Sequence, residues 1–324
     1  MKKLLTQVIR SKEITVLILI IILILILSFG SDVFLNITNF ESMQASIAPN
    51  AIIAVGMMIL LISGVFDLSV GSVMGVTGAI VSLLMAAGLG VIPSIVAGLC
   101  VGLGFGFFNG FLVAFGGVNP LIATIGTLYI GRGLMRAIMR GELRHGIPIK
   151  HESFLILGQG KTFGVYNMFW IMLVIIILAQ FLIVRTYRGR QLFYVGGNYE
   201  ASRLVGIKVK RVRMLTFGLS GLLAAAAGIL STSRFGISSL YLGVNVHLQV
   251  IISCLIGGAS ISGGQGSIIG ALLGVIFLTL IVSAFNILEI GMSWQNIIVG
   301  IILIFIVSVD AYLVTRRRRT LGEI

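Results

Sequence analysis

Long apolar stretches, separated by short polar breaks, run along almost the whole chain. A helix that crosses a bilayer needs about 20 mostly apolar residues. Ten segments meet this criterion: 14–30, 43–63, 70–88, 92–115, 120–139, 166–184, 214–231, 246–262, 267–288 and 293–314. The pattern predicts an all-α polytopic membrane protein with about ten transmembrane helices, forming a single transmembrane domain over residues 1–324.

Two glycine-rich breaks interrupt this pattern in a similar way. Ser63-Gly64 precedes the segment that begins at Gly71, and Gly257-Gly258 precedes the one that begins at Gly266. Transporters often contain internal repeats and discontinuous helices near the substrate path. The breaks therefore predict that some helices are broken or re-entrant, while a chance match between short glycine-rich segments is the alternative to a true repeat.

The composition supports the membrane assignment. The chain of 324 residues is 58% hydrophobic and only 10% charged, whereas soluble domains carry about 25% charged residues. The net charge of +13 does not indicate nucleic-acid binding, because 16 of the 23 basic residues fall into three clusters beside apolar segments. Such clusters are typical of the cytoplasmic flanks of membrane helices.

These clusters predict the topology. They are the N-terminal tail (Lys2, Lys3, Arg10, Lys12), the loop at 185–213 and the C-terminal run (Arg316, Arg317, Arg318, Arg319). An even number of spans places both tails on the side of the loop, so the positive-inside rule predicts that both termini are cytoplasmic. The first apolar run is long enough for a retained anchor, although a cleaved signal peptide is the alternative.

One loop fits the charge rule poorly. The segment 140–165 is external in this topology, yet it contains four basic residues: Arg140, Arg144, Lys150 and Lys161. Glu142 and Glu152 offset part of that charge. The pattern of this loop predicts no function.

The loop at 185–213 is too ordered in composition to be a spacer. Its basic residues are Arg185, Arg188, Arg190, Arg203, Lys208, Lys210, Arg211 and Arg213. We predict a turn at Gly196-Gly197-Asn198, followed by a short helix over 199–204. A short helix on the inner face of a membrane protein indicates a soluble partner.

Regular glycine spacing marks two helix faces. Gly98, Gly102, Gly106 and Gly110 recur every four residues, and Gly266, Gly270 and Gly274 repeat the spacing. Small residues at this interval let helix backbones approach closely in lipid. We expect packing within one bundle, and a self-association face is the alternative.

Asp67 is the only acidic residue between Glu41 and Glu142. An ionisable group within a membrane bundle is costly and often functional, so a proton or ion site is one interpretation. The other is structural: Asp67 and Ser69 precede a helix that begins near Val70, where side-chain oxygens can accept from free N–H groups. We favour the helix cap.

Polar residues inside the spans are candidates for a solute path. They are Asn50, Asn109, Asn119, Thr124, Thr127, Gln249, Ser253 and Asn286. Amide groups suit the hydroxyl groups of an uncharged ligand, and the scarcity of charge in the spans favours a neutral solute. The alternative for each residue is a hydrogen bond between helices.

The sequence gives no support for a metal site or a nucleotide-binding site. Cys100 and Cys254 lie in apolar runs, and the histidines are scattered, so no metal site is expected. Gly158-Gln159-Gly160-Lys161-Thr162 resembles the end of a phosphate-binding loop, but the glycine required earlier is replaced by Leu155. We therefore expect no enzymatic activity, no catalytic residues, and no cofactor in this chain.

Several motifs nevertheless resemble one family. In chain order they are SGVFDLSVGSVMG, FFNGFLVAF followed by Asn119-Pro120, TIGTLYIGRGL, GGNYEASRLVGIKVKRVR, GLSGLLAAAAGIL and IGGASISGGQGSIIG. Together they resemble the inner-membrane permease subunits of ribose/galactose-type, binding-protein-dependent ABC importers over nearly the whole chain. Phe66 departs from the smaller aliphatic residue of many relatives.

The resemblance implies a set of partners and a docking segment. It implies a second permease copy, identical or not, two cytosolic ATPase subunits that bind ATP, and an extracytoplasmic protein that delivers a monosaccharide. In that family the segment expected to dock on the ATPase corresponds to Gly197, Asn198, Glu200, Ala201, Arg203 and Gly206.

Alternatives to a sugar importer remain open. Branched-chain amino acid permeases resemble the same glycine-rich segments, so the resemblance does not fix the solute. A proton-coupled secondary transporter that uses Asp67 would not need the basic loop at 185–213. A purely structural membrane scaffold is disfavoured by the broken and polar segments.

Overall fold

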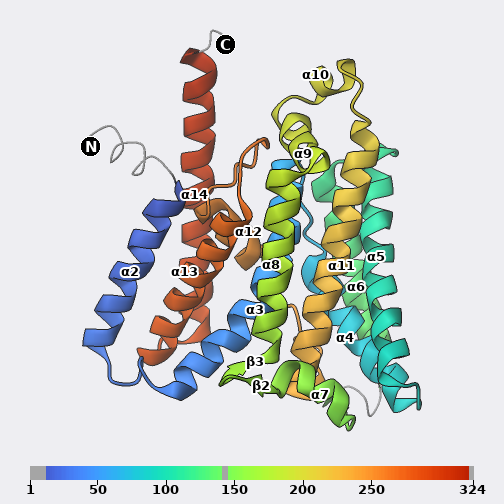
Figure 1. Cartoon of the computed structure of the whole chain (residues 1–324), viewed down its shortest axis with the longest axis vertical. Coiled ribbons are helices and arrows are strands. Elements are labelled where there is room, and N and C mark those ends of the chain that lie inside the picture. Colours follow the sequence, from blue (N-terminus) through green and yellow to red (C-terminus); the bar gives the residue numbers. More distant parts are fainter. Residues whose placement is uncertain (1–11, 141–144, 321–324) are drawn as a thin grey trace.

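The structure is a computed structural model that describes residues 12–140 and 145–320. Helices make up most of these residues (Figure 1). Within these residues lie the helices α2 (Lys12–Gly30), α3 (Ile37–Ile62), α4 (Val70–Ala86), α5 (Val91–Ala114), α6 (Pro120–Ile138), α7 (Glu152–Gln159), α8 (Asn167–Arg185), α9 (Tyr187–Gly197), α10 (Tyr199–Leu204), α11 (Val209–Phe235), α12 (Val246–Ile256), α13 (Ile268–Ile287) and α14 (Met292–Thr320). The short strands are β1 (Ile147–Pro148), β2 (Lys161–Thr162), β3 (Val165–Tyr166) and β4 (Ile237–Ser238). The predicted basic tail at Lys2, Lys3 and Arg10 lies outside the described residues, as do Glu142 and Arg144.

The predicted all-α polytopic class is confirmed. Among the described helices, eight are long and apolar enough to cross a membrane, and α4 and α12 are shorter apolar helices. Together they correspond to the ten predicted segments. Helix α3 begins earlier than predicted, at Ile37, because the side chain of Asn36 accepts a hydrogen bond from the Thr38 N–H at 3.0 Å.

The predicted span at 246–262 is wrong in length. Its helix, α12, ends at Ile256. Gly258 follows with a φ of +99°, a left-handed backbone that stops a helix. At Gly257 the backbone lies so close to α13 that an added Cβ would be 2.1 Å from the carbonyl oxygen of Gly270. The segment between α12 and α13 is therefore an irregular break, as the glycine-rich sequence indicates.

The centre of the bundle is formed by α3 and α11. The most apolar windows of these two helices are 83% and 72% buried, whereas none of the corresponding window of α14 is buried. α11 packs against α3, α4 and α5. On α5 the glycine face meets α11 directly: an added Cβ on Gly106 would lie 2.3 Å from the carbonyl oxygen of Phe217. The expected packing within one bundle is thus confirmed for these glycines.

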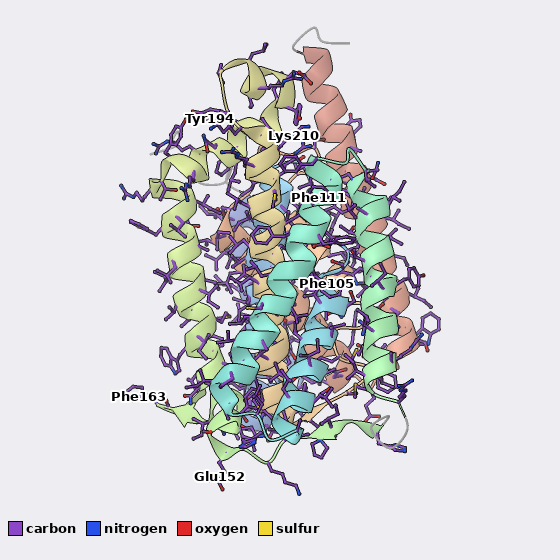
Figure 2. All side chains as sticks on the ribbon, turned by 90° about the vertical axis from the view of Figure 1, so that its right-hand side faces the viewer. Phe105, Phe111, Glu152, Phe163, Tyr194 and Lys210 are labelled. Atoms are coloured by element: carbon purple, nitrogen blue, oxygen red, sulfur yellow. The ribbon has the colours of Figure 1, made fainter. Side chains whose placement is uncertain are left out.

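The two ends of the bundle differ in structure (Figure 1). The start of α2, the end of α14, and the helices α9 and α10 lie at one end, which we call the loop end. The strands β2 and β3 and helix α7 lie at the other, which we call the cap end. Figure 2 shows Tyr194 and Lys210 towards the loop end, and Glu152 and Phe163 at the cap end. The start of α2 and the end of α14 lie at the same end of the bundle, as the predicted even number of crossings requires.

The cap end explains the poor fit of the 140–165 loop to the charge rule. There β1 pairs with β4, and β2 pairs with β3. Lys161 forms an ion pair with Glu41 at the start of α3, and this contact raises the pKa of Lys161. The Tyr166 hydroxyl donates to the same carboxylate at 2.8 Å and accepts from Arg234 at 2.9 Å. Part of the basic charge is therefore neutralised by a neighbouring helix.

Helix α14 is attached to the rest of the bundle through few contacts. It packs mainly on α12. The Asp310 carboxylate accepts hydrogen bonds from the Ser260 hydroxyl and the Ile261 N–H, both at 3.1 Å. These two partners lie in the irregular break after α12. The carboxylate thus satisfies backbone and side-chain donors that the break leaves without helical partners.

Candidate functional site

A small polar cavity lies between α3, α12 and α13. Its volume is about 210 Å³. Four residues of the predicted path line it: Asn50, Gln249, Ser253 and Asn286. The other polar lining residues are Asn39, Ser42, Ser46, Thr279 and Ser283. The described lining contains no ionisable side chain, so the polar side chains that the cavity presents are amides and hydroxyls, beside apolar residues such as Met43 and Val250.

Helical spacing places these residues on one side of each helix. On α3 the lining positions are Asn39, Ser42, Met43, Ser46 and Asn50. Relative to Asn39 they lie at positions i+3, i+4, i+7 and i+11, which keeps them on one face of an α-helix. The opposite side of α3 is packed in the apolar core. The polar stripe on a largely apolar helix is thus what builds this wall of the cavity.

Pro49 interrupts the same helix beside Asn50. Proline has no N–H to donate and clashes with the carbonyl one turn earlier, so it bends a helix at this level. Pro49 lies within the lined stretch of α3, between Ser46 and Asn50.

Two amides in the cavity have no internal partner. The Ser283 hydroxyl donates to Asn39 at 2.9 Å, and Gln295 donates to Asn286 at 3.0 Å. By contrast, the side chains of Asn50 and Gln249 make no hydrogen bond within the described residues. Each offers one acceptor and two donor hydrogens. A ligand with hydroxyl groups would satisfy them.

The other four predicted path residues lie outside this cavity. They are Asn109, Asn119, Thr124 and Thr127. The two threonines donate to carbonyls of their own helix α6, at 2.8 Å and 3.1 Å. Asn119 caps that helix by accepting from the Leu121 N–H at 2.9 Å. In each of these three residues a local hydrogen bond uses one polar group of the side chain, and their place in the path stays a prediction.

Asn109 belongs to a buried cluster with Asp67 and Ser69. The Asp67 carboxylate accepts from the Ser69 N–H at 2.7 Å and from its hydroxyl at 2.6 Å. The Asn109 amide donates to the Ser69 hydroxyl at 2.9 Å, and its own Oδ1 has no partner within the described residues. All three residues are almost completely buried, and within residues 12–140 and 145–320 no basic residue forms an ion pair with the Asp67 carboxylate.

This cluster corrects the predicted helix cap in one respect. Helix α4 does begin at Val70, directly after Ser69. The Ser69 side chain, however, makes no capping hydrogen bond to the helix, because its hydroxyl donates to Asp67. Asp67 holds the N–H of the residue before the helix, in an Asx-turn that fixes the chain at the helix entry.

At the loop end, α9 and α10 form the second candidate site. The predicted helix over 199–204 is confirmed as α10, and Asn198 caps it by accepting from the Ala201 N–H at 2.9 Å. The predicted turn is wrong for Gly196 and Gly197, which form the last residues of α9. At the other end Gly206 has a φ of +86°, and the Ile207 N–H donates to the Ser202 carbonyl at 3.0 Å. This left-handed glycine ends α10.

The predicted docking residues form an exposed surface around α10. Gly197, Asn198, Glu200, Ala201, Arg203 and Gly206 are all exposed. Beside them Leu204 is 86% exposed and Val205 is 76% exposed. These two residues could not be predicted, because in an apolar chain another leucine and valine give no signal. We call these eight residues the α10 surface.

A junction of glycines joins the end of α9 to the end of α3 and to the break between α12 and α13. The Gly264 N–H donates to the Ile62 carbonyl at the end of α3, at 2.9 Å. Gly196 lies against the same carbonyl: an added Cβ would be 1.8 Å from its oxygen and 2.6 Å from the Gly264 nitrogen. An added Cβ on Gly263 would lie 2.8 Å from the Cα of Gly64. The end of α9 thus contacts α3 and the break that joins α12 to α13. These three helices, α3, α12 and α13, also line the cavity.

A bundle of apolar helices around a small uncharged cavity, with an exposed helical loop at one end, defines a multi-pass membrane permease. The chain belongs to the family described as permease components of branched-chain amino acid transport systems, whose model matches residues 39–307. The match covers most of the chain, including the cavity and the α10 surface.

Three relatives illustrate the similarity. The autoinducer 2 import system permease protein LsrC of Escherichia coli strain SMS-3-5 is 31% identical over 303 residues, 94% of this chain and 88% of that relative. The ribose import permease protein RbsC of Haemophilus influenzae is 34% identical over 286 residues, 88% of each chain. The probable ABC transporter permease protein y4mJ of Sinorhizobium fredii is 34% identical over 280 residues, 86% of this chain and 83% of that relative. No solved structure matches the chain. The resemblance to importer permeases is thus confirmed.

Proposed function

We propose that this protein is the transmembrane permease subunit of an ABC importer for a small neutral sugar. The observation that carries the proposal is the cavity between α3, α12 and α13, with free amides at Asn50 and Gln249 and no ionisable lining. Sugar hydroxyls both donate and accept, as these amides do. Relatives named as ribose and autoinducer 2 import permeases support this solute class.

The second candidate solute is a branched-chain amino acid, which the description of the family names. An amino acid carries an ammonium and a carboxylate group at neutral pH. Charged groups inside a membrane bundle are costly unless they meet opposite charges or water. The cavity offers no such partner among its described lining residues, so a neutral sugar fits it better.

The proposal includes partners at both ends of the bundle. An ATPase subunit would bind the α10 surface, which exposes Leu204 and Val205 outside the spans. The ATPase subunit would bind ATP, and this chain would need no cofactor of its own. A sugar-binding protein would dock at the cap end, and a second permease copy, identical or not, would complete the path.

The proposed location is the inner membrane, with the loop end and both termini in the cytosol. The segment 185–213, from the last residue of α8 into the start of α11, holds eight basic residues and one acidic residue, Glu200. An excess of Lys and Arg marks the cytoplasmic side of short loops. At the cap end, Glu41 neutralises Lys161, which lowers the effective positive charge of the opposite side.

The cavity is tested by Asn50→Leu in the complete importer. Loss of a hydrogen bond to an uncharged ligand costs about 1 kcal/mol, and an unpaired ligand hydroxyl raises this cost. We expect the apparent affinity for the sugar during uptake to fall by about tenfold. The measurement is ATP-driven uptake into proteoliposomes that contain the permease, its ATPase and its binding protein, with a panel of labelled sugars and labelled leucine.

Thr127→Val is the matched control, because Thr127 is buried in a span but bonds only to its own helix. This variant should keep the wild-type affinity. Uptake of leucine and of no sugar would overturn the sugar proposal in favour of an amino acid. Equal loss of affinity in both variants would show that the cavity does not select the solute.

Asp67 is proposed to act in structure and not in proton coupling. In Asp67→Asn the remaining oxygen still accepts from Ser69, and the new amide can donate to the unpaired Oδ1 of Asn109. Asp67→Ala removes the acceptor from a buried N–H, which costs about 1–3 kcal/mol. We expect Asp67→Asn to retain uptake and wild-type melting temperature, and Asp67→Ala to melt lower.

A proton-coupled transporter would behave differently, because asparagine does not ionise. Uptake is therefore measured at constant ATP with and without an uncoupler of the proton gradient. An inactive but fully folded Asp67→Asn variant, together with uptake that collapses in the uncoupler, would establish the proton-coupled alternative.

A further inference from the structure

A second hollow, unrelated to the polar cavity, lies between α8 and α11. Its volume is about 1220 Å³, several times that of the polar cavity. Figure 1 shows α8 and α11 running beside each other below α9. Val55 and Ile59 of α3 form its floor, because α3 packs against both of the outer helices. We call this hollow the α8–α11 groove.

The walls of the groove are apolar and open to the surroundings of the bundle. Leu178 and Leu182 of α8, and Leu215 of α11, line it and are each more than half exposed. These residues belong to two helices that are long and apolar enough to cross a membrane. Their exposed side chains therefore face the hydrocarbon region, so the groove opens to lipid and not to water.

The loop end of the same groove is basic. Arg188 of α9, Lys208 before α11 and Arg211 in the first turn of α11 all line it and are exposed. None of the three forms an ion pair with a carboxylate within the described residues. They lie within three residues of the ends of the two spanning helices, at the level where lipid headgroups begin. The free N–H groups at the start of α11 add positive potential there.

We propose that the α8–α11 groove binds an anionic phospholipid of the leaflet at the loop end. Its phosphate-bearing headgroup contacts Arg188, Lys208 and Arg211, and its acyl chains lie between α8 and α11 over Val55 and Ile59. Basic pockets between membrane helices on the cytoplasmic side are suited to such headgroups. The volume exceeds the ~300–1,000 Å³ typical of small-molecule pockets, which agrees with a two-chain lipid.

Charge and shape together select this occupant. A water-soluble ligand would leave the leucine walls wet, and a neutral lipid would leave three cations without a counter-charge. A second copy of the chain would need carboxylates opposite those cations. At the loop end the described exposed carboxylates are few, Glu200 being the one in the α8–α11 loop. The anionic lipid satisfies both the apolar walls and the basic end.

The test uses the full-length permease purified in a mild detergent. Binding of phosphatidylglycerol and of phosphatidylcholine with the same acyl chains is titrated by native mass spectrometry. The groove variant is Arg188→Gln/Lys208→Gln/Arg211→Gln. The matched control is Arg185→Gln/Arg190→Gln/Lys210→Gln, which removes three charges from the same region but from residues that do not line the groove.

We expect the wild type to prefer phosphatidylglycerol, and the groove variant to lose that preference. Near a membrane surface each Lys or Arg contributes about 1 kcal/mol to the attraction of anionic lipid, so the three together give a loss on the order of 100-fold. The control variant should bind as the wild type does. Equal affinity for the two lipids, or equal losses in both variants, would refute a headgroup site in the groove.

A second measurement addresses a protein occupant. Leu219 lines the groove, so Leu219→Cys is made in a chain whose Cys100 and Cys254 are replaced by serine and alanine. In native membranes this cysteine should remain monomeric under mild oxidation. A disulfide-linked pair of permeases at this position would assign the groove to a second copy of the chain and overturn the lipid site. Neither measurement depends on the transported solute.

Discussion

Gly196→Ala is expected to reduce ATP-driven uptake by at least tenfold, while Gly104→Ala, at an exposed helical glycine of α5, leaves uptake unchanged. At Gly196 an added Cβ would lie 1.8 Å from the Ile62 carbonyl oxygen. Because the Cβ is bonded to the backbone and the oxygen belongs to it, no side-chain rotation can relieve this clash. The end of α9 must then move away from α3. Overpacking of this kind costs about 1–3 kcal/mol. At Gly104 an added Cβ meets nothing within 4 Å, and this residue lies outside both the cavity and the α10 surface.

The physical basis of this expectation is the position of the glycine junction. It is where α9, which leads into the α10 surface, contacts α3 and the break that joins α12 to α13. A force applied by an ATPase would reach the three cavity helices through this contact. The measurements are uptake in proteoliposomes and the melting temperature of each purified variant. Wild-type uptake by a folded Gly196→Ala variant would show that the coupling takes another route.

Leu204→Asp combined with Val205→Asp is expected to abolish co-purification of the ATPase. Both side chains are more than three-quarters exposed outside the spans, next to the cap of α10. Full burial of a Leu or Val side chain contributes about 1.5–3 kcal/mol, which corresponds to roughly tenfold or more in affinity for each residue. A buried, unpaired carboxylate adds to that cost.

The control for this prediction is Phe163→Asp. Phe163 is 93% exposed at the cap end, far from the α10 surface, so the ATPase should co-purify at the wild-type level. The interaction is measured by pull-down of the tagged permease and by titration of the ATPase onto permease in nanodiscs. Recovery of the ATPase by the double variant at the wild-type level would place the interface elsewhere on the loop end.

The helices of this fold follow from hydropathy because each spanning segment must bury its own backbone hydrogen bonds in lipid. That requirement is local, so apolar length alone located all ten apolar helices. It does not apply to α9, whose sequence Tyr187–Gly197 contains two arginines and ends in two glycines. Since this helix lies outside the spans, its pattern reads as a loop, and the structure was needed to define it.

The candidate site was only half predictable for a related reason. A polar residue in a span must find a partner, but the sequence does not say whether that partner is a ligand, another helix or its own backbone. Thr124 and Thr127 bond to their own helix, whereas Asn50 and Gln249 bond to nothing within the described residues. The glycine junction could not be predicted from the sequence, because it joins backbone at residues 62–64, 196 and 263–264, which lie far apart along the chain.

The weak attachment of α14 has a consequence for biosynthesis. Chains are made and inserted from the N-terminus, and segments begin to fold in that order. All residues that line the polar cavity, and all that form the glycine junction, precede Met292, the first residue of α14. The transport core can therefore assemble while the last helix is still being synthesised. Asp310 then joins that helix to the finished bundle through Ser260 and Ile261.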